Sequence, residues 1–97
     1  MSKYWCFTLN NPRPQEITSL NDAYEREADI VYIIYGRETG TAGTYHFQGY
    51  LELSTRKRCG GVKRLLGLQR IHLEKRRGSA IQAANYCRKE DQSLVHR

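Results

Sequence analysis

The sequence predicts an α+β domain in which helices cover one face of a mostly antiparallel sheet. Three observations support this prediction. The chain has 97 residues, without an internal repeat or a linker, which suits a single domain spanning 1–97. Four stretches are rich in aromatic and β-branched residues, at about 3–9, 30–35, 44–53 and 69–75. Segments with apolar residues at helical spacing lie between and after them, so the expected order is strand, helix, strand, strand, helix, strand, helix.

The first part of the chain predicts a strand, a helix and a second strand. Residues 3–9 form the first strand, which residues 10–12 (Asn-Asn-Pro) end with turn-forming types and a missing amide hydrogen. A helix is expected over 14–28, because Pro14 suits its first turn and apolar residues recur at helical spacing. Residues 30–35 are apolar on both faces, so this strand is expected to be central and covered on both sides.

A hairpin and a basic helix are expected next. The strand at 44–53 pairs with 30–35 across a loop rich in glycine and threonine. Ser54 or Thr55 can cap a short helix that carries basic residues, and Gly67 can end it.

The last part of the chain predicts a weak strand and a helix. Residues 69–75 alternate weakly, and a final helix is expected from about Ala80 to Asp91. The tail over 92–97 has no pattern and is expected to be loose. The first six elements match the split βαβ pattern of a ferredoxin-like, or RRM-like, fold with a central sheet of about five strands. Such a fold leaves one face of the sheet open, and we expect the active site on that face.

The positive charge is concentrated in the middle of the chain. Nine of the 16 Lys and Arg residues lie between Arg56 and Arg77, where Glu74 is the single acidic residue, and the whole chain carries a net charge of +6. A localised basic block on a small aromatic-rich domain favours a polyanionic partner, with nucleic acid first. A merely solvated basic surface remains the alternative.

Cysteine usage and the N-terminus suggest an intracellular protein. Cys6, Cys59 and Cys87 show no C-x-x-C spacing, which argues against a disulfide or zinc framework and for a reducing compartment. No apolar run is long enough to span a bilayer. The chain passes directly from Met1 into the first strand pattern, so no signal peptide is expected.

Three polar residues around the predicted hairpin could form a metal site. His46 and Gln48 are two residues apart on a strand, so both side chains project from the same face. Glu38 is expected across the hairpin from His46. A carboxylate, an imidazole and an amide oxygen suit Mg²⁺ or Mn²⁺, and the imidazole favours Mn²⁺. On spacing alone, two ordinary polar residues on a half-exposed strand and a loop carboxylate are an equal alternative.

The last predicted helix carries a candidate nucleophile. Helical spacing places Tyr86 and Lys89 side by side on one edge, and a nearby cation or metal favours the phenolate form of tyrosine. Glu90 and Asp91 follow directly and could add an outer contact or a further metal oxygen. An exposed helix with an ordinary surface tyrosine and lysine is the alternative.

Three short motifs, taken together, resemble those of a known family. Residues 7–12 (FTLNNP), 46–48 (HFQ) and 86–89 (YCRK) look like the motifs of the replication initiator (Rep) proteins of circular single-stranded DNA viruses. The resemblance is to the circovirus and nanovirus branch, whose nicking domains are HUH endonucleases. All three motifs occur in the family's order and at its spacing, and they cover nearly the whole chain.

The resemblance implies a nicking and joining reaction that initiates rolling-circle replication. Tyr86 would attack a phosphodiester in the loop of an origin hairpin, forming a 5′-phosphotyrosine, and Lys89 would assist there. Glu38, His46 and Gln48 would hold the divalent metal, Mn²⁺ or Mg²⁺. Gln48 stands where the family's name expects a second histidine, which is usual in this branch.

The resemblance also suggests where DNA binds and what the full protein contains. The residues expected to contact single-stranded DNA are Asn10 and Asn11 in the first motif and the basic residues Lys57, Arg58, Lys63, Lys75, Arg76 and Arg77. Full-length members carry a helicase domain after this one, and are expected to oligomerise through that region and to act in the host nucleus.

Two other functions remain as alternatives. One is a non-catalytic RRM-like module that binds single-stranded nucleic acid, in which strand aromatics stack on bases and Tyr86 is a surface residue. The other is a small interaction domain with a basic face, which leaves the ordered motifs unexplained.

Overall fold

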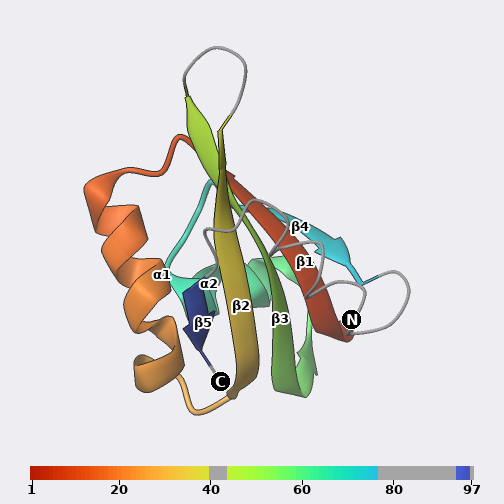
Figure 1. Cartoon of the computed structure of the whole chain (residues 1–97). Helices are drawn as coiled ribbons and strands as arrows, with labels where there is room; N and C mark the ends of the chain where they lie inside the picture. The colour runs from red at the N-terminus through yellow and green to blue at the C-terminus, as the bar shows by residue number, and fades with distance from the viewer. Residues whose placement is uncertain (40–43, 77–93, 97) are drawn as a thin grey trace.

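A five-stranded antiparallel sheet organises the chain in the computed structural model, which describes residues 1–39, 44–76 and 94–96. The elements are β1 (Ser2–Asn10), α1 (Pro14–Arg26), β2 (Ile30–Thr39), β3 (Tyr45–Lys57), α2 (Cys59–Leu66), β4 (His72–Lys75) and β5 (Leu94–His96). The strand order is β4-β1-β3-β2-β5, so β3 lies between β1 and β2, and β1 lies between β3 and β4 (Figure 1). This split βαβ arrangement confirms the predicted α+β, ferredoxin-like class.

Both helices contribute to one core on one face of the sheet. Trp5, Phe7 and Leu9, alternate residues of β1, are buried in this core. Leu20 of α1 and Leu66 of α2 are buried in the same cluster. Because residues two apart on a strand share a face, the intervening residues of β1 lie on the opposite, open face.

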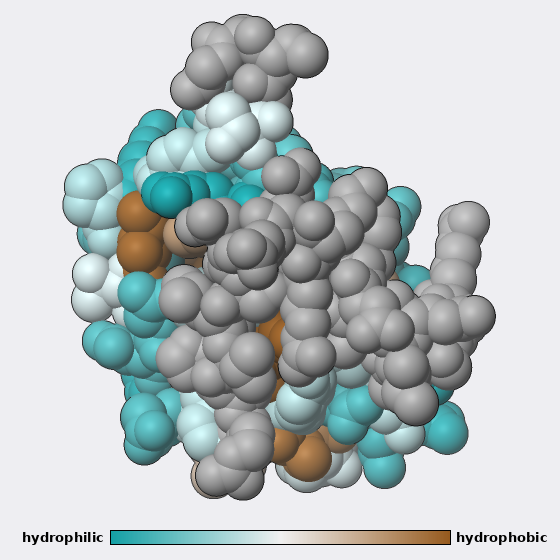
Figure 2. Space-filling view, viewed as in Figure 1, coloured by the Kyte–Doolittle hydropathy of each residue, from teal (hydrophilic) through white to brown (hydrophobic). Residues whose placement is uncertain are grey.

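The open face carries a smaller apolar cluster among polar groups. Ile34 of β2 and Tyr50 of β3 are fully buried there, with Cys6 and Tyr32 packed against them. In the space-filling view the visible described surface is mostly hydrophilic, with small, separate apolar patches (Figure 2). On the open face, this apolar cluster therefore lies next to the polar residues His46 and Gln48, which alternate with Phe47 along β3.

The two strands of the hairpin are longer than the sequence predicts. β2 continues to Thr39 because residues 36–39 pair with the start of β3, and β3 continues to Lys57, which pairs with Ser2. β2 is an interior strand, as predicted, because β3 and β5 flank it. Its cover is incomplete, since Val31 is 52% exposed. The longer β2 places Glu38 inside the strand, in direct register with His46.

Ser54 and Thr55 do not cap α2, contrary to the prediction. Their hydroxyls donate hydrogen bonds to the carboxylate of Asp29 and so tie the end of β3 to the connection between α1 and β2. α2 begins after Arg58, which is extended at the N-cap position. Gly67 ends the helix in the left-handed conformation, with φ 71°, as predicted.

The end of the chain also departs from expectation. The tail prediction is wrong over Leu94–His96, which forms β5 and pairs with β2. A strand of three residues is too short for its alternation to be recognised in a sequence. The helix predicted over 80–91 lies outside the described residues. Neither α1 nor α2, the helices in the described part of the chain, is long and apolar enough to cross a membrane.

Candidate metal centre

A row of three polar residues crosses the open face at one end of the sheet. His46 of β3 is in register with Asn10 of β1 on one side and with Glu38 of β2 on the other. His46 Nε2 and Glu38 Oε1 are 2.9 Å apart and share a hydrogen bond in which the ring nitrogen donates. The two side chains are 27% and 13% exposed, so the pair is accessible from the open face but largely shielded.

Gln48 lies one step further along the same face. It follows His46 by two residues on β3 and is in register with Thr8 and with Gly36, which has no side chain. The three predicted ligands therefore share the open face of two neighbouring strands. The hairpin register brings them there, although eight to ten residues separate Glu38 from the other two in the sequence.

The donor set fits a divalent cation. Glu38 Oε2 is buried and has no hydrogen-bond partner among the described residues. A buried carboxylate oxygen without a partner is costly, and a bound cation would compensate it. One carboxylate, one imidazole and one amide oxygen suit Mn²⁺ or Mg²⁺. Within the described ranges no group of three His, Cys, Asp or Glu residues could hold a metal ion, so among these residues the amide of Gln48 is the candidate third ligand.

The turn after β1 is held beside this row. Asn11 has a positive φ of 45°, a conformation that asparagine tolerates better than most residues. Its backbone N–H donates to the carbonyl oxygen of Tyr45 at 3.0 Å. Because Tyr45 directly precedes His46, the turn formed by Asn10 and Asn11 lies at the edge of the candidate metal centre.

The predicted basic residues do not gather around Glu38, His46 and Gln48. Lys75 is in register with Trp5 and Lys57 with Ser2. These rows are five and eight residues from Asn10 along β1, which corresponds to about 16 and 26 Å. Lys63 lies on α2, on the helix-covered side of the sheet.

Two of these basic residues have partners within the protein. Lys57 forms an ion pair with Asp29 at 3.1 Å. The Arg76 guanidinium lies 4.2 Å from the ring centroid of Tyr4 and donates to the Tyr50 hydroxyl at 2.9 Å. Exposed Arg58 belongs to the same far end of the sheet.

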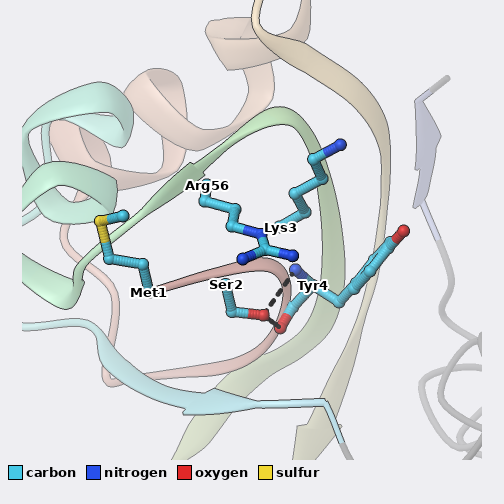
Figure 3. Close-up of a pocket in the computed structure, with 5 residues that line it drawn as sticks. All are labelled: Met1, Ser2, Lys3, Tyr4 and Arg56. Atoms are coloured by element: carbon cyan, nitrogen blue, oxygen red, sulfur yellow. Dashed lines mark hydrogen bonds between the residues drawn. The ribbon is translucent and has the colours of Figure 1, made fainter.

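A shallow basic pocket lies at this far end. It has a volume of about 370 Å³ and is lined by Met1, Ser2, Lys3, Tyr4 and Arg56 (Figure 3). The Arg56 guanidinium points across it toward Ser2 and Tyr4. The candidate metal centre and the basic far end are therefore separate regions of one sheet.

Tyr50 is near the site but is unsuited to act as a nucleophile. Burial raises the pKa of its phenol, and so does its hydrogen bond to Glu52, to which it donates at 2.7 Å. Burial likewise raises the pKa of Tyr35, on the core side. Both phenols are held protonated. The predicted nucleophile Tyr86, with Lys89, Glu90 and Asp91, lies outside the described residues, and so does Arg77, which is predicted to contact DNA.

Sequence reasoning missed two residues beside the site, Glu16 and Arg70. Glu16 Oε1 accepts a hydrogen bond from the backbone N–H of Arg13 at 2.8 Å, as the third helical residue does in a capping box. A glutamate three residues after the N-cap position is a capping-box feature, so the sequence alone could have indicated this role of Glu16. Arg70 forms an ion pair with Glu16 at 2.6 Å, but no local pattern identifies a partner 54 residues away.

The comparison with protein families matches nearly the whole chain. Residues 2–90 match the viral replication protein family. This range includes Glu38, His46 and Gln48, and it also includes Tyr86 and Lys89.

Curated relatives agree with this match. The chain is 44% identical over 94 residues to the replication-associated protein of Pigeon circovirus, covering 97% of this chain and 28% of that protein. It is 43% identical over 91 residues to the master replication protein of Milk vetch dwarf virus, covering 93% and 28%. It is also 43% identical over 91 residues to the replication-associated protein of Beak and feather disease virus, covering 94% and 30%. The chain thus spans less than a third of the length of these relatives, and it belongs to the viral replication protein family.

Proposed function

We propose that this domain is a metal-dependent, sequence-specific endonuclease and strand-transferase for single-stranded DNA, which initiates rolling-circle replication of a circular viral genome. The observation that carries the proposal is the Glu38–His46 pair on the open face, with a buried carboxylate oxygen that lacks a partner among the described residues. Membership of the viral replication protein family gives this pair its context. The relatives' names, replication-associated and master replication protein, support the same role.

Glu38, His46 and Gln48 would hold Mn²⁺ or Mg²⁺ at the end of the β2–β3 hairpin. When bound there, the cation would neutralise a non-bridging oxygen of the scissile phosphate. The rigid pairing of β2 with β3 fixes the spacing of the carboxylate and the imidazole before metal binds. Such preorganisation reduces the free-energy cost of assembling the site.

Tyr86 would be the nucleophile, with Lys89 beside it to favour the phenolate and stabilise the phosphotyrosine. The phenolic oxygen forms a bond to phosphorus, and the bond from phosphorus to the 3′ oxygen breaks. The phenol loses its proton, and the departing 3′ oxygen gains one to become a free 3′-hydroxyl. No water is consumed, so a 3′-hydroxyl can later attack the 5′-phosphotyrosine and rejoin the strand.

Single-stranded DNA at an origin hairpin loop would be the partner. The turn at Asn10 and Asn11, beside His46, would contact the strand near the scissile phosphate. Phosphates further along the strand would be held by Lys57, Arg58, Lys63, Lys75, Arg76 and Arg77. In the full protein, a following helicase region would provide oligomerisation, and the reaction would take place in the host nucleus.

The test does not require the origin sequence. A library of end-labelled stem-loop oligonucleotides with a randomised loop is incubated with the protein and Mn²⁺, and adducts that survive denaturation are counted. We expect the wild type to form adducts with a defined loop sequence. Tyr86→Phe should form none, whereas Tyr24→Phe on α1, at the helix-covered core, should match the wild type. Absence of adduct from the wild type, or equal adduct from Tyr86→Phe, would refute the proposal. Binding that is independent of Mn²⁺ and unaffected by Tyr86→Phe would indicate a non-catalytic RRM-like module instead.

A further inference from the structure

One arginine joins three segments of the chain next to the candidate metal centre. Arg70 lies between α2 and β4. Its Nη2 donates to the backbone carbonyl oxygens of Asn10 and Asn11, both at 3.2 Å, and to Glu16 Oε1 at 2.6 Å. Its Nε donates to Glu16 Oε2 at 3.1 Å, which completes a two-pronged contact with the carboxylate.

Glu16 connects this contact to the start of α1. Its Oε1 also accepts from the backbone N–H of Arg13, so the carboxylate is fixed from two sides. The hydrogen bond from Arg70 lowers the pKa of Glu16, with the Arg13 N–H as the next cause. The carboxylate therefore stays ionised, and the guanidinium is held in one orientation.

The turn held by Arg70 needs such support. Asn11 has a positive φ of 45°, a region that residues other than glycine occupy at a cost. Two contacts hold it there: its own N–H to the Tyr45 carbonyl oxygen at 3.0 Å, and its carbonyl oxygen to Arg70. Asn10, one residue before, is in register with His46. Arg70 thus helps to set the geometry of the turn, although it is not one of the proposed metal ligands.

We propose that Arg70 and Glu16 form a positioning pair, which holds the turn of Asn10 and Asn11 in the geometry that aligns a DNA strand with the Glu38–His46 pair. This inference rests on the proposed function, because it assigns these residues a role in that reaction. Arg70 acts through the turn and does not touch the reacting atoms. Its planar guanidinium donates to two carbonyl oxygens and to both oxygens of one carboxylate, an arrangement that a lysine ammonium cannot reproduce.

The pair is expected to affect alignment more than binding. The Arg70 and Glu16 side chains are 38% and 12% exposed, so the ion pair is partly open to solvent, where screening keeps its contribution to global stability small. Most of the predicted phosphate contacts lie about 16 Å or more away along the sheet. Loss of Arg70 should therefore lower the rate of adduct formation at saturating DNA while leaving DNA affinity nearly unchanged.

The experiment compares Arg70→Gln with Arg64→Gln, which removes the same charge from an exposed position on α2. For Arg70→Gln we expect adduct formation at saturating DNA to fall at least about tenfold, with a change in Kd below about threefold. Arg70→Lys should recover only part of the rate. Glu16→Gln should also slow the reaction, and adding it to Arg70→Gln should cause less than the product of the two losses, because the residues act as one unit.

A second measurement reports on the pair without catalysis. Hydrogen exchange of the Asn11 amide, which bonds to Tyr45, should accelerate at least about tenfold in Arg70→Gln and stay unchanged in Arg64→Gln. Unchanged exchange, or equal losses of rate and affinity, would overturn the positioning role. If the wild type forms no adduct, the proposed function fails, while the exchange measurement still decides whether Arg70 holds the turn. If Arg70→Gln does not fold, Arg70→Lys is measured in its place.

Discussion

Glu38 and His46 face each other across the β2–β3 ladder, with the carboxylate Oε1 2.9 Å from the imidazole Nε2. The second carboxylate oxygen is buried and lacks a partner in the part of the chain that the structure describes. The pair is thus preorganised and incompletely satisfied, two properties that suit a binding site better than a purely structural ion pair.

Metal binding should depend on this pair. We expect Mn²⁺ at 100 times its Kd to raise the free energy of unfolding of the wild type by about 2.7 kcal/mol. The Tm should rise accordingly. Glu38→Gln and His46→Ala should abolish most of this shift. Glu74→Gln, an exposed carboxylate on β4, should retain it. Differential scanning calorimetry with and without Mn²⁺ measures the effect, and an undiminished shift in Glu38→Gln would exclude the carboxylate as a ligand.

Tyr50→Phe should preserve the reaction. The phenol of Tyr50 has a raised pKa and hydrogen bonds to Glu52 and Arg76, so it acts as a structural link. Its removal should cost about 1–3 kcal/mol of unfolding free energy, because two hydrogen bonds are lost. Urea denaturation gives the stability, and the stem-loop library gives adduct formation. Loss of adduct from a folded Tyr50→Phe protein would make Tyr50, in place of Tyr86, a candidate for the nucleophile.

Gly49→Ala should strongly destabilise the fold. A Cβ at this position would overlap Phe7 Cζ and would lie 2.6 Å from the Ile34 carbonyl oxygen, so the packing must shift. Overpacking of this kind costs at least about 1–3 kcal/mol. Gly61→Ala in α2 is the control, because its Cβ would meet Lys57 only at 3.5 Å and alanine favours the helix. Chemical denaturation of both variants decides; equal stability would mean that the Phe7 ring moves freely.

Acid should destabilise the protein partly through Asp29. The hydrogen bond from Ser54 is the largest cause that lowers the pKa of Asp29 below its ordinary value of 3.8, followed by contacts from Lys57 and Thr55. Since the folded pKa is the lower one, the stabilisation is present above pH 3.8 and is lost as the pH falls through the folded pKa. Asp29→Asn should therefore flatten the fall of Tm below about pH 4. Thermal melts between pH 2.5 and 6 test this, with Glu25→Gln as control, and an identical slope in Asp29→Asn would contradict it.

Single-stranded DNA binding should depend on Arg76 more than on Lys63. Arg76 stacks on Tyr4 at the end of the open face, whereas Lys63 lies on α2 at the helix-covered side. Arg76→Gln should reduce the slope of log K against log salt by about 0.7, the value for one phosphate contact on a single strand. Fluorescence anisotropy at several salt concentrations measures both variants. A larger change from Lys63→Gln would mean that DNA passes over the helices.

Local periodicity was enough to predict that Glu38, His46 and Gln48 share one face of the sheet, but not what surrounds them. His46 and Gln48 share a face because strands alternate with period two, and a hairpin places Glu38 opposite His46. The link between Arg70 and Glu16 spans 54 residues and depends on how the α2–β4 connection packs, which no local pattern encodes. Ser54 and Thr55 are residue types that favour an N-cap, which is why the sequence predicts that they cap α2. Because β3 extends to Lys57, they lie within the strand instead, and their hydroxyls donate to the carboxylate of Asp29.

β3 has a consequence for how this site can change during evolution. On one side of the strand are His46 and Gln48, and on the other are Phe47 and Gly49, which pack into the core against β1 and β2. We expect a substitution that shifts Phe47 or the Phe7 ring to displace the β3 backbone, which carries both proposed ligands. Metal preference should therefore respond to mutations in the helix-side core, so that selection on the ion and selection on the core cannot proceed independently.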